Sequence, residues 1–464
     1  MLLDLLYGGL LVWVATVMMR DLIFGVRPIS HDHTVHYFKA WQLREYFLPR
    51  FQLHGFSHRW FAGYPVNYLY PVGTDLFVNA VDLLGFGTFS FARAYGIAFW
   101  LFHVFTGLAG YRLGRMLAGP HVGLISGFLL MTDLSAFRFG GWAYTIEYGV
   151  WPQALSLVFA LLATVRVPEI FQERALRPIG LFALRMGLSI VTHPIELIYL
   201  GLLLVAAVLA GLFSPDVRTA RGTVRLLAAY ALSAMVAAVW LLPFVKSGSH
   251  TTPMGVWWDS TYELGKGLIT LEAFPGTIGY VLAFGVLACL LLLQSRQFSL
   301  LLCAFMALLV PALSNSSVID ELHLPELSAS FAKIQWLRMA TMAKPFWFVM
   351  AAYLAVLFLR RAKNLLPDES RGSVRPRSLA RDVVFGMVIA QLTLPFVVQA
   401  GQSFFTSNIA KSLNTETDRG LDQDRAKLVE WLQSHLPNDG FYRVCVSTGH
   451  NHDLLDIGTQ IDKP

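Results

Sequence analysis

The sequence is poor in charge and in cysteine, and both shortages exclude whole classes of protein. Only 14% of its 464 residues are Asp, Glu, Lys or Arg, whereas soluble domains carry roughly a quarter. Its 3 cysteines are too few for a disulfide framework and form no Cys-x-x-Cys metal motif. Hydrophobic residues, in contrast, make up 55% of the chain. These proportions exclude a soluble enzyme, a coiled coil, a disordered chain and a disulfide scaffold.

Long uncharged runs recur along the chain, and a run of about 18 apolar residues predicts a membrane-spanning helix. We therefore expect an all-α polytopic membrane protein with about 11 transmembrane helices. The predicted spans are 5–19, 94–111, 116–132, 148–165, 178–195, 197–215, 226–245, 273–295, 298–319, 345–359 and 383–410. Arg20 and Asp21 follow the first run without a small-residue cleavage site, so this run is interpreted as a retained helix.

Lys and Arg gather in alternate connections, which sets the expected orientation because short cytoplasmic loops are rich in basic residues. The basic clusters are 112–115, 166–177, 218–225 and 360–381. All of them are cytoplasmic if 26–92 contains no full crossing. In that case 26–92 is the first extracytoplasmic loop, and 72–85 is an amphipathic helix at the membrane interface. The net charge of +6 then follows from topology and does not indicate nucleic-acid binding.

Two domains are expected. Residues 1–400 form the transmembrane domain, in which 360–382 is a cytoplasmic basic linker, and 401–464 is an extracytoplasmic segment. This tail predicts a polar helix, a Pro-Asn-Asp-Gly turn and a short strand, as at the start of a C-terminal α/β domain. Because the sequence stops at Pro464 soon after that strand, we expect the domain to be incomplete.

The first outer loop places an acid among three histidines: His31, Asp32, His33 and His36. On a helix, Asp32 and His36 share one face. There the carboxylate can act as a general base or metal ligand, and the imidazoles can orient it. The His-x-His-x-x-His spacing also permits a zinc site, although no fourth ligand is near. The plain alternative is an interfacial helix whose polar face meets lipid headgroups, and the need for a divalent metal is left open.

Further polar residues mark the predicted outer face. Arg59 and Tyr64 belong to an aromatic loop with Gly and Pro, which can stack on sugars or sit at the headgroup belt. Glu147 stands at a helix entrance, where it can also be a simple helix cap. His193 interrupts an apolar run at an outer turn. Arg338 lies in an outer loop whose cations can hold a lipid phosphate or make ordinary headgroup contacts.

The order of these motifs resembles the polytopic membrane proteins labelled 6-pyruvoyl-tetrahydropterin-synthase-related, which are similar in layout to GT-C glycosyltransferases. The motifs that carry the resemblance are His31-Asp32-His33, Arg59-Trp60-x-x-Gly63-Tyr64-Pro65, Gly114–Gly119, Glu147, His193 and Ile334–Arg338. They span most of residues 20–360. Two motifs depart from the family pattern. Leu337 directly precedes Arg338, where the family has Pro before an aromatic-Arg pair, and the aromatic loop ends in Tyr70-Pro71-Val72 without a double proline.

The resemblance implies a membrane glycosyltransferase that moves a sugar from a polyprenyl-phosphate donor to an extracytoplasmic acceptor, with inversion. It implies Asp32 as the base, Glu147 as the second-loop acid, Arg338 as the phosphate contact and His193 in the cleft. The remaining candidate substrate-binding residues are His31, His33, His36, Arg59 and Tyr64. The expected partners are a polyprenyl-phosphate-linked sugar and membrane lipids, and the expected location is the inner or plasma membrane.

Two alternatives to the transferase stay open. One is a non-catalytic GT-C-like scaffold subunit of a larger membrane complex, which would have membrane protein partners. The other is a lipid or glycan transporter. A transporter is expected to carry intramembrane charges on several helices, often in repeated halves, whereas the spans predicted here are nearly free of charge.

Overall fold

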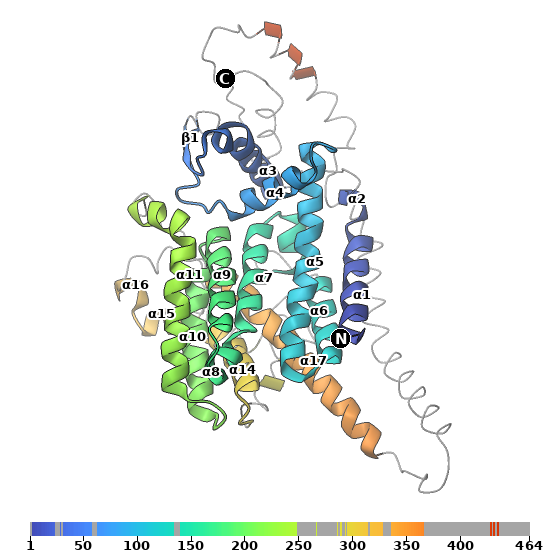
Figure 1. Cartoon of the computed structure of the whole chain (residues 1–464), viewed down its shortest axis with the longest axis vertical. Coiled ribbons are helices and arrows are strands. Elements are labelled where there is room, and N and C mark those ends of the chain that lie inside the picture. The colour runs from blue at the N-terminus through green and yellow to red at the C-terminus, as the bar shows by residue number, and fades with distance from the viewer. Residues whose placement is uncertain are drawn as a thin grey trace, which may run out of the picture.

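The computed structural model describes residues 2–23, 31–57, 63–133, 140–247, 295–313, 316–327 and 336–365, with a few isolated positions elsewhere. Within these ranges the protein is mostly helical (Figure 1). Four helices are long and apolar enough to cross a membrane, namely Trp151–Gln172, Glu196–Phe213, Thr219–Ser247 and Thr341–Arg360. Shorter apolar helices are Leu2–Met18, Pro120–Thr132 and Phe298–Leu313.

The predicted apolar runs correspond to helices wherever the structure describes them. These helices are α1 (Leu2–Met18), α5 (Phe91–Ala118), α6 (Pro120–Thr132), α7 (Trp151–Thr164), α9 (Arg177–Thr192), α10 (Glu196–Phe213), α11 (Thr219–Ser247), α14 (Phe298–Leu313) and α17 (Ala340–Leu365). Short helices connect or flank them: α2 (Arg20–Ile23), α8 (Val167–Gln172), α15 (Ser316–Glu321) and α16 (Leu324–Leu327).

Some predictions fall where the structure says little. The runs at 273–295 and 383–410 lie almost wholly outside the described residues, so the predicted number of spans is not confirmed. The same holds for the tail 401–464 and its α/β domain. Only the beginning of the predicted linker 360–382 is described, and there α17 continues as a helix to Leu365.

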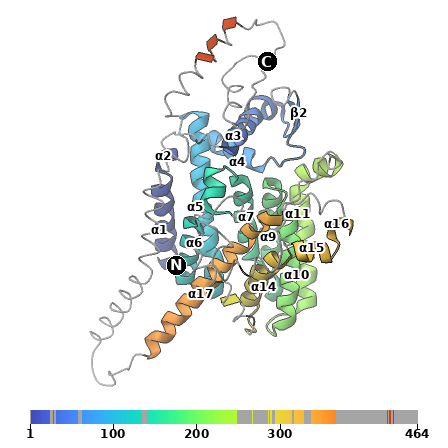
Figure 2. The same ribbon diagram turned by 180° about the vertical axis from the view of Figure 1, so that it is seen from behind.

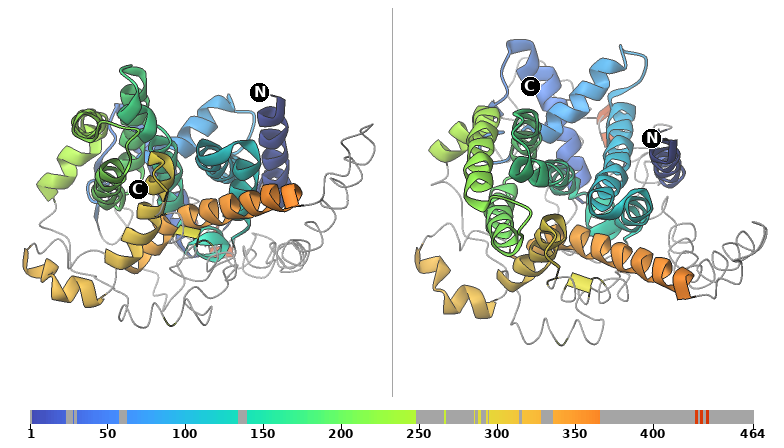
Figure 3. Two further views of the ribbon diagram at one scale, coloured as in Figure 1. Left: turned by 90° about the horizontal axis from the view of Figure 1, so that it is seen from below. Right: turned by 60° about the horizontal axis from the view of Figure 1, so that its bottom comes forward.

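Helices α5 and α6 pack through glycine, which lets their backbones touch. A Cβ on Gly127 would come within 2.5 Å of the Gly107 carbonyl oxygen, and one on Gly114 within 2.7 Å of the Val122 carbonyl oxygen. Such close approach is how helices associate in lipid, where burial of apolar surface gives little driving force. Helix α17 crosses the bundle obliquely, in contact with α6 and α14 (Figures 2 and 3).

One end of the bundle is capped by the segment between α2 and α5 (Figure 1). It contains α3 (Asp32–Gln42), a π-helical turn (Leu43–Phe47), a 3-10 turn (Leu48–Arg50), β1 (Gly55–Ser57), β2 (Tyr64–Val66) and α4 (Gly73–Leu84). The strands pair antiparallel, with Ser57 opposite Tyr64. Helices α3 and α4 have 11 and 12 residues, fewer than the roughly 20 that cross a membrane. We name residues 31–90 the cap.

The cap is fixed to the bundle at a specific point. At Gly73 a Cβ would come within 2.7 Å of the Val191 carbonyl oxygen, so the start of α4 touches the end of α9. Helix α3 is held on α4 by Asn79, whose amide donates to the Ala40 carbonyl oxygen over 2.9 Å. The polar face of α3 is thereby brought to the turn between α9 and α10.

Candidate active site

The first turn of α3 carries a strained backbone. His31 precedes the helix with φ 44°, which is unusual for a residue with a side chain and is often found at functional sites. Asp32 is the first helical residue, where its negative charge is favoured by the helix dipole. The Asp32 amide donates to the Tyr148 carbonyl oxygen over 3.1 Å. The cap, which belongs to the predicted first outer loop, is therefore attached at the predicted base to the connection between α6 and α7. We name this connection, described from Gly140 onward, the second outer loop after its predicted side.

His33 completes this attachment from inside. Its side chain is fully buried, and its Nε2 donates to the Ile146 carbonyl oxygen over 2.7 Å. The Tyr95 hydroxyl lies 3.1 Å from its Nδ1 and accepts a hydrogen bond from the indole of Trp151 over 3.0 Å. Both ring nitrogens of His33 thus contact protein groups, and the geometry gives this histidine a role in joining the two outer loops.

The second outer loop brings a second acid to the same place. A π-helical turn (Ala143–Glu147) ends at Glu147, and Gly149 follows at φ 77°. A Cβ on Gly149 would come within 2.7 Å of the His33 amide nitrogen. The exposed His31 ring stacks on Tyr148, with centroids 4.4 Å apart. Burial raises the pKa of Glu147, and His31 partly opposes this.

Tyr70 is the centre of a second group of side chains. Its ring lies 5.9 Å from the His36 ring and 5.7 Å from the His193 ring, measured between centroids. The Lys39 ammonium lies 4.3 Å from the Tyr70 ring centroid. Burial raises the pKa of Tyr70; Asp32 adds to this and Arg338 opposes it. Both predicted functional charges therefore lie within electrostatic reach of the Tyr70 hydroxyl.

The two histidines of this group are neutral near pH 7. Burial lowers the pKa of His36 well below its usual value, and the neighbouring Lys39 adds to the effect. Burial also lowers the pKa of His193 to about 3, assisted by Arg338 and Lys39. The His193 Nδ1 accepts the Ile195 amide over 3.3 Å, whereas the buried His36 Nδ1 has no hydrogen-bond partner among the described residues.

Lys39 and Asp75 form a buried ion pair beneath Tyr70. The Lys39 Nζ lies 3.4 Å from an Asp75 oxygen, and the two side chains are 3% and 1% exposed. Burial raises the pKa of Asp75 to about 6, although Lys39 opposes the rise. Burial lowers the pKa of Lys39. Asp75 belongs to the predicted interfacial helix, but its carboxylate is directed to Lys39 and buried, so it does not contribute to a headgroup-facing surface.

Arg338 is the member of the Tyr70 group that lies farthest along the sequence. It lies in a 3-10 turn (Trp336–Met339) just before α17, with its guanidinium 5.6 Å from the Tyr144 ring centroid. The side chain is half-buried, and its Nε finds no hydrogen-bond partner in the described part of the chain. No ion pair of Arg338 is present among those residues either. Among the described residues Arg338 is therefore a cation without a carboxylate partner, and it acts on the same tyrosine, Tyr70, as Asp32 does.

The structure thus brings together most of the predicted site residues. Some lie at the start of α3 and its contact with the second outer loop, and the others lie around Tyr70. The predicted residues at these two places are His31, Asp32, His33, His36, Glu147, His193 and Arg338. Tyr64 lies in β2, where burial raises its pKa and Asp75 adds to this, while Arg59 lies outside the described residues. Within the described ranges no three His, Cys, Asp or Glu side chains are grouped so as to hold a metal ion, and the zinc site stays a prediction without support.

Sequence reasoning missed four members of the site, which are Lys39, Tyr70, Asp75 and Tyr144. A signal existed for Lys39, because it follows Asp32 and His36 at helical spacing and so continues their face. Tyr70 was seen only as part of an aromatic loop. No local pattern pairs Asp75 with Lys39 or Tyr144 with Arg338, because both contacts join separate elements.

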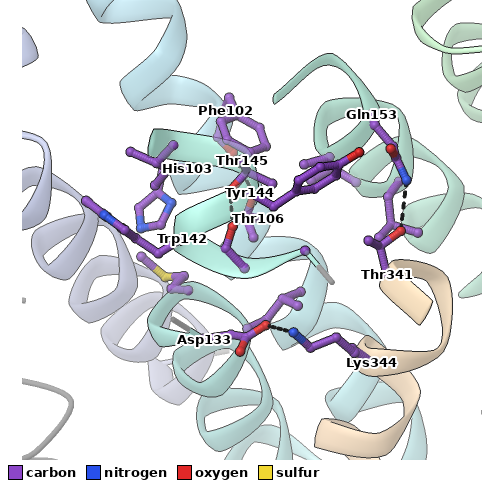
Figure 4. A pocket seen from close by; sticks show the side chains of 18 of the residues that line it. Phe102, His103, Thr106, Asp133, Trp142, Tyr144, Thr145, Gln153, Thr341 and Lys344 are labelled. Carbon is purple, nitrogen blue, oxygen red and sulfur yellow. Dashed lines mark hydrogen bonds and ion pairs between the residues drawn. The ribbon is translucent and has the colours of Figure 1, made fainter. Parts of the chain in front are cut away.

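A cavity of about 70 Å³ lies behind the second outer loop. Its walls come from α5, α6, α7, α17 and the second outer loop, and Phe102, Trp142 and Tyr144 supply aromatic surface (Figure 4). Two pairs of polar side chains lie at its edge in the same view, Asp133 with Lys344 and Gln153 with Thr341. The cavity is otherwise mainly apolar.

Comparisons with known proteins identify a family and a fold. The model of a family described as "Family of unknown function (DUF6541)" matches residues 116–444. No curated protein matches the chain. Among solved structures, the Archaeoglobus fulgidus oligosaccharyltransferase tethered to an acceptor peptide is 14% identical, with a TM-score of 0.55. That match covers 98% of this chain and 63% of the oligosaccharyltransferase, so this chain spans less than two thirds of its length.

Two further structures bind lipid phosphates. AglB from Archaeoglobus fulgidus, in complex with an inhibitory peptide and a dolichol-phosphate, is 13% identical with a TM-score of 0.53, covering 93% of this chain and 58% of AglB. ArnT from Cupriavidus metallidurans, bound to undecaprenyl phosphate, is 13% identical with a TM-score of 0.55, covering 98% of this chain and 84% of ArnT. These neighbours have the GT-C fold, and such low identity shows a shared fold alone. The pterin-synthase-related label is not confirmed.

Proposed function

The chain belongs to the DUF6541 family and is an integral membrane protein of the GT-C fold, and we propose that it is a glycosyltransferase that uses a polyprenyl-phosphate-linked sugar. One observation carries this proposal. A half-buried Arg338, which forms no ion pair within the described residues, and the carboxylate of Asp32 both act on the Tyr70 hydroxyl, although they come from opposite ends of the described chain. A cation for phosphate and a base for a hydroxyl are the two groups that this transfer needs.

The proposed donor side is built around Arg338. A guanidinium presents several N–H donors in a plane and matches a phosphate well. Its ion-pairing capacity is unused within the described residues, and the Tyr144 ring supports its face. The neutral His36 and His193 flank the same position through Tyr70. They can donate hydrogen bonds to phosphate oxygens without adding a fixed charge.

The proposed acceptor side is built around Asp32. Its carboxylate takes the proton from the acceptor hydroxyl as that oxygen attacks the anomeric carbon of the sugar. The bond from this carbon to the phosphate oxygen breaks, and its electron pair leaves with the polyprenyl phosphate, whose charge Arg338 stabilises. One displacement inverts the anomeric centre. Glu147, with its raised pKa, and the stacked His31 line the exposed side of this position.

We propose that the site faces the extracytoplasmic side, since the basic connections gather at the opposite end of the bundle from the cap. These basic residues lie at 112–115 in the last turns of α5, at 166–177 from the end of α7 through α8 to the start of α9, and at 218–225 at the start of α11. The positive-inside rule makes their end cytoplasmic. Figure 1 shows the cap at the other end. A long lipid can then keep its tail in the bilayer while its phosphate reaches Arg338.

Native mass spectrometry of the purified chain tests the proposal through the lipid that copurifies. We expect the wild type and Asp32→Asn to carry a polyprenyl phosphate or its glycosylated form, with the glycosylated form enriched in Asp32→Asn because transfer is blocked. Loss of a general base lowers the rate about 10²–10⁴-fold. Arg338→Gln should lose the lipid. Matched controls are Asp82→Asn and Arg44→Gln, which break a cap ion pair away from the site.

The opposite result would favour a different function. If wild type, Asp32→Asn and Arg338→Gln all carry the same bulk phospholipids and nothing else, the proposed donor is wrong. The chain would then be better described as a non-catalytic GT-C-like subunit. A search for proteins that copurify would follow, and normal glycan levels in cells carrying only Asp32→Asn would support that conclusion.

A further inference from the structure

The second outer loop bridges the two halves of the proposed site. At one end its residues 146–149 contact the first turn of α3, through the carbonyl oxygens of Ile146 and Tyr148. At the other end Tyr144 lies against the Arg338 guanidinium, and Gly140 lies against Thr341. A Cβ on Gly140 would come within 3.1 Å of the Thr341 Cγ2. The loop therefore contacts both the proposed base and the proposed phosphate-binding residue.

A buried ion pair fixes this loop to α17. Asp133 directly follows the last residue of α6, and its side chain pairs with Lys344 of α17. The two side chains are 3% and 2% exposed. The Trp142 amide donates to the Asp133 carbonyl oxygen over 2.6 Å, so the same residue holds the loop by its backbone and α17 by its side chain. Figure 4 shows the pair at the edge of the cavity.

A second contact continues the connection to Arg338. The Gln153 amide of α7 donates to the Thr341 hydroxyl over 2.9 Å. That hydroxyl in turn donates to the Arg338 carbonyl oxygen over 2.6 Å. The turn that carries Arg338 is thus fixed one helical turn before Lys344. Lys344 and Thr341 thus attach the loop and the Arg338 turn to neighbouring positions of α17.

We propose that Asp133 and Lys344 are a positioning pair, which sets the separation of Asp32 and Arg338 by clamping the second outer loop to α17. The effect of this pair on catalysis rests on the proposed function, whereas the attachment of the loop to α17 does not depend on it. A buried ion pair is seldom more stable than an apolar pair of the same volume, and the best-attested use of such pairs is to fix one arrangement among several. A clamp between two segments distant in sequence is a use of that kind.

Hydrogen exchange of residues 140–149 tests the clamp directly in the full-length protein. Lys344→Met removes the ion pair with Asp133, and we expect amide exchange in this segment to accelerate about tenfold or more, since local opening then costs less free energy. The double variant Asp133→Asn/Lys344→Gln replaces the ion pair by a neutral hydrogen-bonding pair and should restore much of the protection. The control is Asp4→Asn, which removes the exposed pair between Asp4 and Arg115 at the other end of α5.

Binding of added undecaprenyl phosphate, followed by native mass spectrometry, supplies the functional readout. Lys344→Met should weaken it and the double variant should recover it, although neither residue is proposed to touch the lipid. Unchanged exchange of 140–149 in Lys344→Met would overturn the clamp, as would a double variant no better protected than the single one. If the wild type binds no undecaprenyl phosphate, the proposed function fails, while the exchange data still decide the clamp.

Discussion

Two buried lysine–aspartate pairs lie in different places within the described part of this protein, and they are built differently. Lys344 and Asp133 are in direct contact across the cavity edge. Lys39 and Asp75 are equally buried, but their closest atoms are 3.4 Å apart. The Lys39 Nζ and both Asp75 carboxylate oxygens have no hydrogen-bond partner among the described residues. One pair is closed, and the other is loose and lies beneath the Tyr70 ring.

This difference in contact geometry suggests that the two pairs have different roles. Unsatisfied buried polar groups are costly, and native proteins keep them mainly where they serve a function. The loose pair lies next to His36 and His193, within the group that surrounds Tyr70. The closed pair lies at the junction of a loop and a helix. We therefore expect the closed pair to act on the site only through the loop and helix that it joins, and the loose pair to act on the site directly.

The largest expected effect is the loss of the closed pair. Lys344→Met removes one partner of a buried ion pair, which costs about 3–5 kcal/mol in comparable pairs. Lys39→Met should cost less, because Asp75 already has a raised pKa and can become neutral. Unfolding in detergent, followed by circular dichroism, compares the two variants. Equal losses would show that the two pairs do not differ in this way.

Replacing both residues of the loose pair should change the stability in the opposite direction from replacing one. Lys39→Met/Asp75→Leu removes both charges and keeps the buried volume similar, and such replacements are neutral or stabilise by about 1–4 kcal/mol. We expect this variant to unfold at or above the wild-type temperature and to bind less undecaprenyl phosphate, because the charges beneath Tyr70 are gone. A variant that is less stable than wild type would contradict the assignment of the loose pair to the site.

The sequence predicts the helices well because their cause is local. Apolar runs such as 94–111 and 197–215 have to bury their backbone hydrogen bonds in lipid, and only a helix does so within one segment. The absence of a full crossing in 26–92, which the basic clusters indicate, stays a prediction; the two helices described there, α3 and α4, have 11 and 12 residues. The spans at 273–295 and 383–410 stay predictions, because the structure does not describe them.

The site was predictable only where one helix carries it. Asp32 and His36 share a face of α3, as their spacing requires. The contacts of Lys39 with Asp75 and of Tyr144 with Arg338 depend on how separate elements pack, and a single sequence contains no signal for them. His33 shows that even a residue within a recognised motif can have a role that the motif does not predict. Its motif indicated substrate binding, whereas its side chain is buried against Ile146 and Tyr95, since nothing in the motif states which way an imidazole points.

The loose pair should also make the folding stability depend on pH. The pKa of Asp75 is 3.8 in a peptide and about 6 in the folded chain. Between these values the folded state binds the proton more tightly than the unfolded state, so its stability falls as the pH rises from about 4 to about 6. At about 1.36 kcal/mol per pH unit, the loss is at most about 3 kcal/mol. The stability advantage of Lys39→Met/Asp75→Leu over wild type should therefore grow across this window.

Measuring both proteins from pH 4 to pH 7 in the same detergent compares them over the titration of Asp75, because the pKa of His193 in the wild type is about 3 and lies below this window. A stability difference that stays constant with pH would mean that Asp75 titrates normally in the folded state. The loose pair would then be less strained than its burial indicates.

The smallest effect is expected for an ion pair that is not buried. Arg166 and Glu169 pair at the predicted cytoplasmic end, where their side chains are 24% and 34% exposed and the closest atoms lie 2.6 Å apart. Water replaces a lost partner there, so Glu169→Gln should cost no more than about 1 kcal/mol, and less at high salt. The same unfolding assay measures it beside Lys344→Met. A loss of stability as large as that of Lys344→Met would mean that burial does not decide how much an ion pair contributes here. The Arg166–Glu169 pair also has close contacts, but it has ready access to water.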